Sequence, residues 1–171
     1  LLWRRHKPTI IAITGSVGKT STKDAIYAAV KGSVRARKSE KSFNSDIGVP
    51  LTVLGLPNGW SNPVLWLRNL IDGFFTAAFS KDYPDVLILE TGIDQPGDMD
   101  KITAWVKPDI VVLTRLPDVP VHVEYFKTPE DVVREKRKLV QAMKDDGKLV
   151  FNQDDAIIQA QITRRHESRD G

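Results

Sequence analysis

The stretch that decides the fold reads Ile10-Ile11-Ala12-Ile13-Thr14-Gly15-Ser16-Val17-Gly18-Lys19-Thr20-Ser21-Thr22. Its first residues are apolar and largely β-branched, which predicts a buried parallel strand. Two glycines follow within a short turn, and a helical pattern then continues through Val30. A strand, a glycine-containing loop and a helix in this order predict a phosphate-binding loop, because backbone N–H groups and the helix N-terminus face the anion.

Individual side chains of this loop have expected roles. Lys19 can reach the terminal phosphates of a nucleotide, and the Thr20 hydroxyl can bind Mg²⁺. The surviving motif is Gly-x-x-Gly-Lys-Thr, since Ile13 occupies the position of the first glycine of the full pattern. The alternative is a plain strand–helix turn with a solvated lysine. The expected nucleotide contacts are Gly15, Ser16, Val17, Gly18, Lys19, Thr20 and Ser21.

Composition limits the class of protein. The chain has 171 residues, 41% of them hydrophobic and 27% charged, as in a globular domain with a core of its own. A net charge of +3 does not indicate a nucleic-acid partner. The absence of cysteine excludes disulfides and thiolate metal sites. The first residue is leucine, and we expect the chain to be an excised fragment of a longer protein.

Further apolar runs at residues 86–89, 110–114 and 148–152 alternate with helical stretches. This alternation predicts a single α/β domain over residues 1–171, with a doubly wound, mostly parallel sheet flanked by helices. Glu90 follows the first of these runs, at the sheet edge where α/β proteins bind ligands. The loop around Asn44 and Ser45 is rich in small polar residues, so it could hold substrate or form an ordinary turn.

A helix is predicted to begin at Asn62-Pro63 and to end near Phe79, within an apparent insertion over about residues 60–82. Its broad apolar face favours packing on this domain or on a neighbouring one. Binding at a membrane interface is the alternative. Arg68, Asn69 and Asp72 interrupt the apolar run, so a membrane span is not indicated.

A second amphipathic helix begins at Thr128-Pro129. Lys136 falls within its inward stripe of Val132, Val133, Leu139 and Val140, whereas Arg134, Glu135, Arg137 and Lys138 are expected to flank or oppose that stripe. An inward-facing lysine must extend to solvent, find a partner or lose its charge.

From about Pro8 to Asp155 the chain resembles the central ATP-binding domain of the Mur ligase family. The resemblance rests on motifs in the family order: Thr14-Gly15-Ser16-Val17-Gly18-Lys19-Thr20, Phe43-Asn44-Ser45-Asp46-Ile47-Gly48-Val49-Pro50-Leu51-Thr52, Glu90-x-Gly92, His122-x-Glu124-x-Phe126, Lys136 and Asn152-Gln153-Asp154-Asp155. The first is similar to the family's shortened phosphate loop, which accounts for the missing glycine.

The resemblance implies a cytoplasmic, ATP-dependent ligase of peptidoglycan precursor synthesis that forms an amide bond through an acyl phosphate. D-alanyl-D-alanine and a UDP-N-acetylmuramoyl peptide are the implied substrates, with Asn44 and Ser45 at the substrate. Two Mg²⁺ ions are implied, with Thr20, Glu90, His122 and a carbamylated Lys136 as ligands. Lys19, Lys136 and His122 are the implied catalytic residues.

The family also implies N-terminal and C-terminal ligase domains, which we expect to be absent from this fragment and without which it should be inactive. Three other readings stay open at this point. The first is a related ligase with another acceptor, such as a folylpolyglutamate-type enzyme. The chain could instead belong to an NTPase that forms no amide, or to a non-catalytic module that docks a partner.

Overall fold

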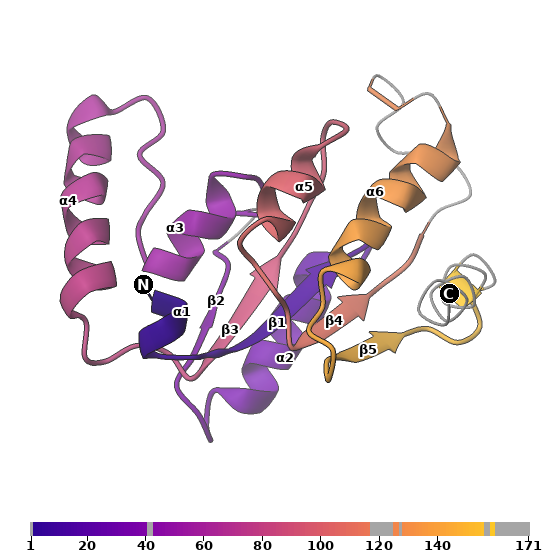
Figure 1. Cartoon of the computed structure of the whole chain (residues 1–171), viewed down its shortest axis with the longest axis horizontal. Coiled ribbons are helices and arrows are strands. Elements are labelled where there is room, and N and C mark those ends of the chain that lie inside the picture. The colour runs from indigo at the N-terminus through magenta and orange to yellow at the C-terminus, as the bar shows by residue number, and fades with distance from the viewer. Residues whose placement is uncertain (1, 41–42, 117–124, 127, 156–157, 160–171) are drawn as a thin grey trace.

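In the computed structural model, the described residues are 2–40, 43–116, 125, 126, 128–155, 158 and 159. They contain a five-stranded sheet in the order β2-β3-β1-β4-β5 (Figure 1). The strands are β1 (Thr9–Thr14), β2 (Ala36–Lys38), β3 (Val86–Glu90), β4 (Ile110–Leu113) and β5 (Lys148–Phe151). The helices are α1 (Leu2–Arg5), α2 (Lys19–Val30), α3 (Gly48–Leu54), α4 (Pro63–Phe79), α5 (Asp98–Thr103) and α6 (Pro129–Gln141).

All neighbouring strands of this sheet pair in parallel, which confirms the predicted α/β class. β1 lies in the middle, with Ile11 opposite Ile88 of β3 on one side and Ile110 of β4 on the other. The chain first builds the β3 side of the sheet and then crosses to the β4 side. The carboxyl ends of β1, β3 and β4 therefore meet at a topological switch point, where α/β sheets bind ligands.

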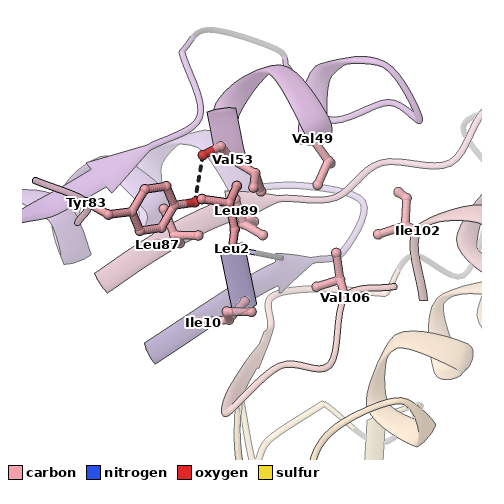
Figure 2. Packing of buried hydrophobic residues seen from close by; sticks show 9 residues of the cluster. All are labelled: Leu2, Ile10, Val49, Val53, Tyr83, Leu87, Leu89, Ile102 and Val106. Carbon is pink, nitrogen blue, oxygen red and sulfur yellow. Dashed lines mark hydrogen bonds between the residues drawn. The ribbon is translucent and has the colours of Figure 1, made fainter. Parts of the chain in front are cut away.

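Helices cover both faces of the sheet. On one face, Ile11, Ile13 and Ile88 pack against Ile26 and Tyr27 of α2. On the other face, residues of α1, α3 and α5 form a cluster with β1 and β3 (Figure 2): Leu2, Ile10, Val49, Val53, Tyr83, Leu87, Leu89, Ile102 and Val106. The Tyr83 hydroxyl donates a hydrogen bond of 2.6 Å to the Val53 carbonyl, and burial raises the pKa of Tyr83 to about 12.

The helix that carries Lys136 begins as predicted. Thr128 and Asp131 form a reciprocal capping box, with Pro129 in the first turn. One expectation for this helix is wrong, because Glu135 is buried. Its Oε1 accepts hydrogen bonds from the Gly97 and Met99 amides, at 2.9 and 3.0 Å. Glu135 thereby satisfies N–H groups at the start of α5 and fixes α6 against α5.

The predicted helix at Asn62-Pro63 is also present, and the Asn62 side chain accepts hydrogen bonds from the amides of Val64 and Leu65. Its apolar face was expected to pack on this domain or on a neighbouring one; it does not pack on this domain, and packing on a neighbouring domain stays a prediction. Asn69 and Gly73 are its buried residues, whereas the large apolar side chains lie on the exposed side. Among the described residues, no helix combines the length and apolarity needed to cross a bilayer.

Candidate nucleotide-binding site

The turn between β1 and α2 depends on two glycines with positive φ. Gly15 has φ +147°, and a Cβ there would lie 1.9 Å from Thr114 Oγ1. Gly18 has φ +84° at the N-cap of α2, with no atom within 4 Å of an added Cβ. Close approach of β4 and backbone conformation therefore both require glycine at position 15, whereas conformation alone requires it at position 18.

The segment after β4 holds this turn in place. The Ser16 amide donates a 2.7 Å hydrogen bond to the Arg115 carbonyl, and Val17 forms an isolated antiparallel bridge with Arg115. The sequence analysis did not single out Arg115. Because its contribution is made by the backbone, no side-chain pattern signals it.

Glu90 lies at the carboxyl end of β3 beside the first turn of α2. The Thr20 hydroxyl lies 3.1 Å from each carboxylate oxygen of Glu90. Lys23 Nζ donates to Glu90 Oε2 at 3.1 Å, and the side chains of Lys23 and Glu90 are 1% and 3% exposed. The Glu90 carboxylate is thus buried with a hydroxyl and an ammonium as its neighbours.

Lys136 approaches the same turn from α6. Its Nζ donates a 2.6 Å hydrogen bond to Ser16 Oγ. Burial, and secondarily repulsion by Lys19, lowers the pKa of Lys136 to about 7. The partner of this inward-facing lysine is therefore a neutral hydroxyl. A hydroxyl does not hold the amine in its charged form as a carboxylate would.

Both lysines line a cavity of about 50 Å³ at the switch point. The lining residues come from four separate segments: Gly15, Ser16, Lys19, Asn44, Gly92, Ile93, Asp94, Val132 and Lys136. The Gly92 amide donates to the Asn44 carbonyl at 2.7 Å, and a Cβ on Gly92 would lie 2.7 Å from Asn44 Nδ2. Lys19 and Lys136 beside a glycine turn and a helix N-terminus make this cavity suited to an anion.

The structure brings together most of the residues predicted for the site. Gly15, Ser16, Lys19, Asn44 and Lys136 line the cavity, while Thr20 and Glu90 contact each other beside it. Gly18 starts α2, and Val17 and Ser21 are exposed on the turn and on α2.

Of the remaining predicted residues, one is placed differently and one is not described. Ser45 does not line the cavity, because its Oγ accepts a hydrogen bond from the Gly48 amide at the start of α3. His122 lies outside the described residues.

The fit of a metal ion can be judged from the donors at this site. Among the described residues, no group of three or more His, Asp or Glu side chains is arranged so that it could hold a metal ion. Thr20 and Glu90 nevertheless place a hydroxyl and a carboxylate side by side, and these are the oxygen donors that Mg²⁺ prefers. Mg²⁺ keeps several waters and uses phosphate oxygens, so one such pair fits a nucleotide-bound ion. The Lys136 amine offers no oxygen unless it is modified.

Lys23 is the site residue that the sequence analysis missed. It is almost completely buried. The signal was available, because Lys23 belongs to the stripe formed with Ile26, Tyr27 and Val30 at helical spacing. The reasoning that identified Lys136 as an inward-facing lysine applies to it without change.

A central parallel strand that leads through a glycine turn into a helix, with lysines around the turn, defines a phosphate-loop α/β domain. The family model of the Mur ligase middle domain matches residues 69–169, which is more than half of the chain. The chain therefore belongs to the Mur ligase family.

Curated relatives agree with this assignment, and a solved structure shares the fold. The chain is 28% identical over 150 residues to the UDP-N-acetylmuramoyl-tripeptide–D-alanyl-D-alanine ligase of Bacillus subtilis, covering 88% of this chain and 27% of that protein. It is 32% identical over 152 residues to the ligase of the same name from Mycobacterium leprae, covering 89% and 24%. The chain thus spans about a quarter of the length of these relatives. The MurF ligase of Thermotoga maritima, solved with ADP, has the same fold, with a TM-score of 0.69, 22% identity and coverage of 95% of this chain and 32% of that one.

Proposed function

We propose that this chain is the ATP-binding middle domain of a ligase that adds D-alanyl-D-alanine to a UDP-N-acetylmuramoyl tripeptide. Such an enzyme would act in the cytoplasm in peptidoglycan precursor synthesis, and thus in cell-wall biogenesis, cell shape and cell division. The names of the curated relatives and the ADP bound to the Thermotoga neighbour support the proposal. The observation that carries it is the convergence of Glu90 and Lys136 on the glycine turn.

The proposed reaction has two steps. A carboxylate oxygen of the tripeptide attacks the γ-phosphorus of ATP, and the bond to the bridging oxygen of ADP breaks. The amine of D-alanyl-D-alanine then attacks the carbonyl carbon of the acyl phosphate, loses a proton and releases phosphate. Because the first step brings two anions together, positioning and neutralisation of charge supply most of the catalysis.

The residues of the turn take the nucleotide in this proposal. Gly15, Ser16, Val17, Gly18 and Ser21 would surround the phosphates, and Lys19 would neutralise the charge that develops during transfer. Thr20 and Glu90 would hold one Mg²⁺, which when bound offsets phosphate charge. Lys23 would keep the Glu90 carboxylate oriented. Asn44 and Ser45 remain our prediction for contact with the peptide substrate.

Lys136 would act as a carbamate. A pKa of about 7 gives this lysine a large fraction of neutral amine near physiological pH. The neutral nitrogen would attack CO₂ and lose a proton, so that a neutral amine beside Lys19 becomes an anionic carbamate with two oxygens. Those oxygens, together with His122, would serve a second Mg²⁺.

Nucleotide binding by this chain is the first test. We expect a fluorescent ATP analogue to bind in the presence of Mg²⁺, and Lys19→Ala to weaken binding about tenfold or more, because a charge-assisted phosphate contact is lost. Lys31→Ala, on an exposed residue at the end of α2, is the matched control and should bind as the wild type does. Equal binding by the wild type and Lys19→Ala would contradict the proposed contact between Lys19 and the phosphates.

Ligation requires the full-length protein. We expect product to depend on ATP, the nucleotide-sugar tripeptide and the dipeptide together. Lys136→Ala should nearly abolish it, with partial rescue by a small carboxylic acid that replaces the carbamate. Lys138→Ala is the matched control on the same helix. Use of folates would favour the folylpolyglutamate-type alternative, and ATP turnover without a carboxylate acceptor would favour an NTPase.

A further inference from the structure

Helix α4 carries an apolar surface that the described domain leaves uncovered. Seven of its large apolar side chains are about half exposed or more: Val64, Leu67, Leu70, Ile71, Phe74, Phe75 and Phe79. Trp60, which precedes the helix, is 79% exposed, whereas Leu65 and Trp66 are half-buried. Phe74, Phe75 and Phe79 also contact one another through their rings. Contiguous apolar patches larger than roughly 300–600 Å² are uncommon on soluble monomers, and such patches mark binding surfaces.

The opposite side of α4 attaches the helix to the domain. Asn69 Nδ2 donates a 2.7 Å hydrogen bond to the Pro57 carbonyl. Gly73 lies against Leu54 and Leu56, since a Cβ at this position would be 3.2 and 3.3 Å from their methyl groups. A polar residue and a glycine therefore face the protein, and the apolar half of the helix points away from it. In Figure 1, α4 stands at the outer edge of the molecule, beyond α3.

The width of the apolar surface indicates what covers it. Val64, Leu67, Ile71, Phe74 and Ala78 follow the three-and-four spacing of a coiled-coil seam, which a single partner helix could bury. Leu70, Phe75 and Phe79 lie beside this seam and widen the apolar arc to about half of the helix circumference. A second copy of α4 would leave these flanking side chains in water, whereas the apolar interior of a bilayer could bury the whole arc.

Charges and aromatic side chains surround this arc in the manner of an interfacial helix. Arg68 is exposed at the edge of the arc, where it pairs with Asp72. Lys81 is exposed just beyond the C-terminal end of the helix, and Arg5 donates a hydrogen bond to the Ala78 carbonyl there. Trp60 stands at the other end. Lysine, arginine and tryptophan side chains reach the headgroup level while their apolar parts stay in contact with lipid.

We propose that α4 binds the surface of a bilayer that contains anionic lipids. The helix lies in the membrane plane with its apolar half at the boundary between headgroups and acyl chains. Its 17 residues extend about 25 Å along that plane. Because α4 contributes no residue to the nucleotide cavity, this proposal is independent of the proposed ligase function.

Vesicle flotation with this chain tests the proposal. We expect the protein to float with vesicles of phosphatidylcholine and phosphatidylglycerol, more weakly with phosphatidylcholine alone, and with a blue shift of tryptophan emission. Leu67→Glu and Phe74→Glu should each weaken partition about tenfold or more, because a charge replaces a buried apolar side chain. Val150→Glu, at an exposed apolar residue of β5, is the matched control and should float as the wild type does.

Three results would overturn the proposal. One is a wild-type chain that is folded and does not float with either vesicle. The second is flotation that survives both glutamate substitutions together. The third is a wild-type dimer that Leu67→Glu converts to a monomer, without any vesicle binding, since this would assign the surface to a second copy of the chain. Light scattering after gel filtration, with thermal melts to verify folding, separates these outcomes.

Discussion

The ammonium of Lys23 lies 3.1 Å from Oε2 of Glu90, and both side chains are almost completely buried. The pair joins α2 to the end of β3 directly beneath the glycine turn. Thr20 contacts the same carboxylate from the solvent side, so Glu90 belongs to both the core and the site. This arrangement separates two effects of substitution, loss of stability and loss of nucleotide binding.

Lys23→Met should destabilise the fold by about 3–5 kcal/mol, because it leaves the Glu90 carboxylate buried without its cation. The double variant Lys23→Met/Glu90→Gln should recover part of this loss, since the uncompensated charge is then removed. Urea unfolding measures both. Arg68→Met, which breaks an exposed ion pair on α4, is the control and should cost less than about 1 kcal/mol. A similar small cost for Lys23→Met would contradict a stabilising pair.

Lys136 should make stability depend on pH. The folded-state pKa of about 7 lies below the ordinary value of 10.5, so between these values the unfolded chain holds a proton that the folded chain lacks. The free energy of unfolding should therefore rise with pH across this window, by up to about 1.4 kcal/mol per pH unit from this group. This rise in the free energy of unfolding begins near the folded-state pKa of about 7 and is complete above the ordinary value of 10.5.

Lys136→Met should remove this contribution to the slope and should be more stable than the wild type near neutral pH. Urea unfolding between about pH 7 and pH 9, in buffer free of CO₂ so that Lys136 stays an unmodified amine, measures the slope for both proteins. Lys31→Met, at an exposed lysine, should keep the wild-type slope. Parallel profiles for the wild type and Lys136→Met would mean that Lys136 is not desolvated in solution.

The glycines of the turn should differ in their sensitivity to substitution. Gly18→Ala should cost about 1–2 kcal/mol from backbone conformation alone. Gly15→Ala should cost more, because its Cβ also collides with Thr114. Adding Thr114→Ala should therefore relieve part of the Gly15→Ala loss and none of the Gly18→Ala loss. Gly32→Ala, which has neither positive φ nor a close neighbour, serves as the control in thermal melts.

Glu135→Ala should destabilise the contact between α5 and α6 by about 1–3 kcal/mol, since it leaves buried N–H groups of α5 without an acceptor. Faster amide exchange at Met99 than in the wild type would locate the effect. Glu130→Ala, in the exposed first turn of α6, should cost about 1 kcal/mol or less and leave that exchange rate unchanged. Equal effects of the two substitutions would refute the role assigned to Glu135.

Sequence patterns predicted the parts of the fold that follow from local chemistry. The apolar runs became strands β1, β3, β4 and β5, and Asn62 and Thr128 cap the helices they were expected to cap. Lys136 was identified because a charged residue interrupts an apolar stripe. The rule that α/β sheets bind ligands at the carboxyl ends of their strands placed Glu90 at this edge, whereas its proximity to Thr20 was implied by the resemblance to the Mur ligases.

Tertiary context decided what the patterns could not. An apolar stripe indicates which side of a helix avoids water, but the stripe does not say what covers it. In α4 the small surface of Gly73 allows close approach to α3, and this contact, rather than the apolar side, orients the helix. Glu135 was assigned to the wrong side because its partners are backbone amides of α5, which have no signature in side-chain periodicity.

The central place of β1 in the sheet has a consequence for synthesis on the ribosome. β1 pairs with β3 and β4, and β2 pairs with β3, so the first strand pair requires residues that emerge some seventy positions after β1. Until then, the apolar strand that carries the glycine turn has no hydrogen-bonding neighbour among the described strands. Productive folding must therefore wait for the second half of the chain, and a nascent polypeptide that ends before β3 would expose an aggregation-prone segment to chaperones.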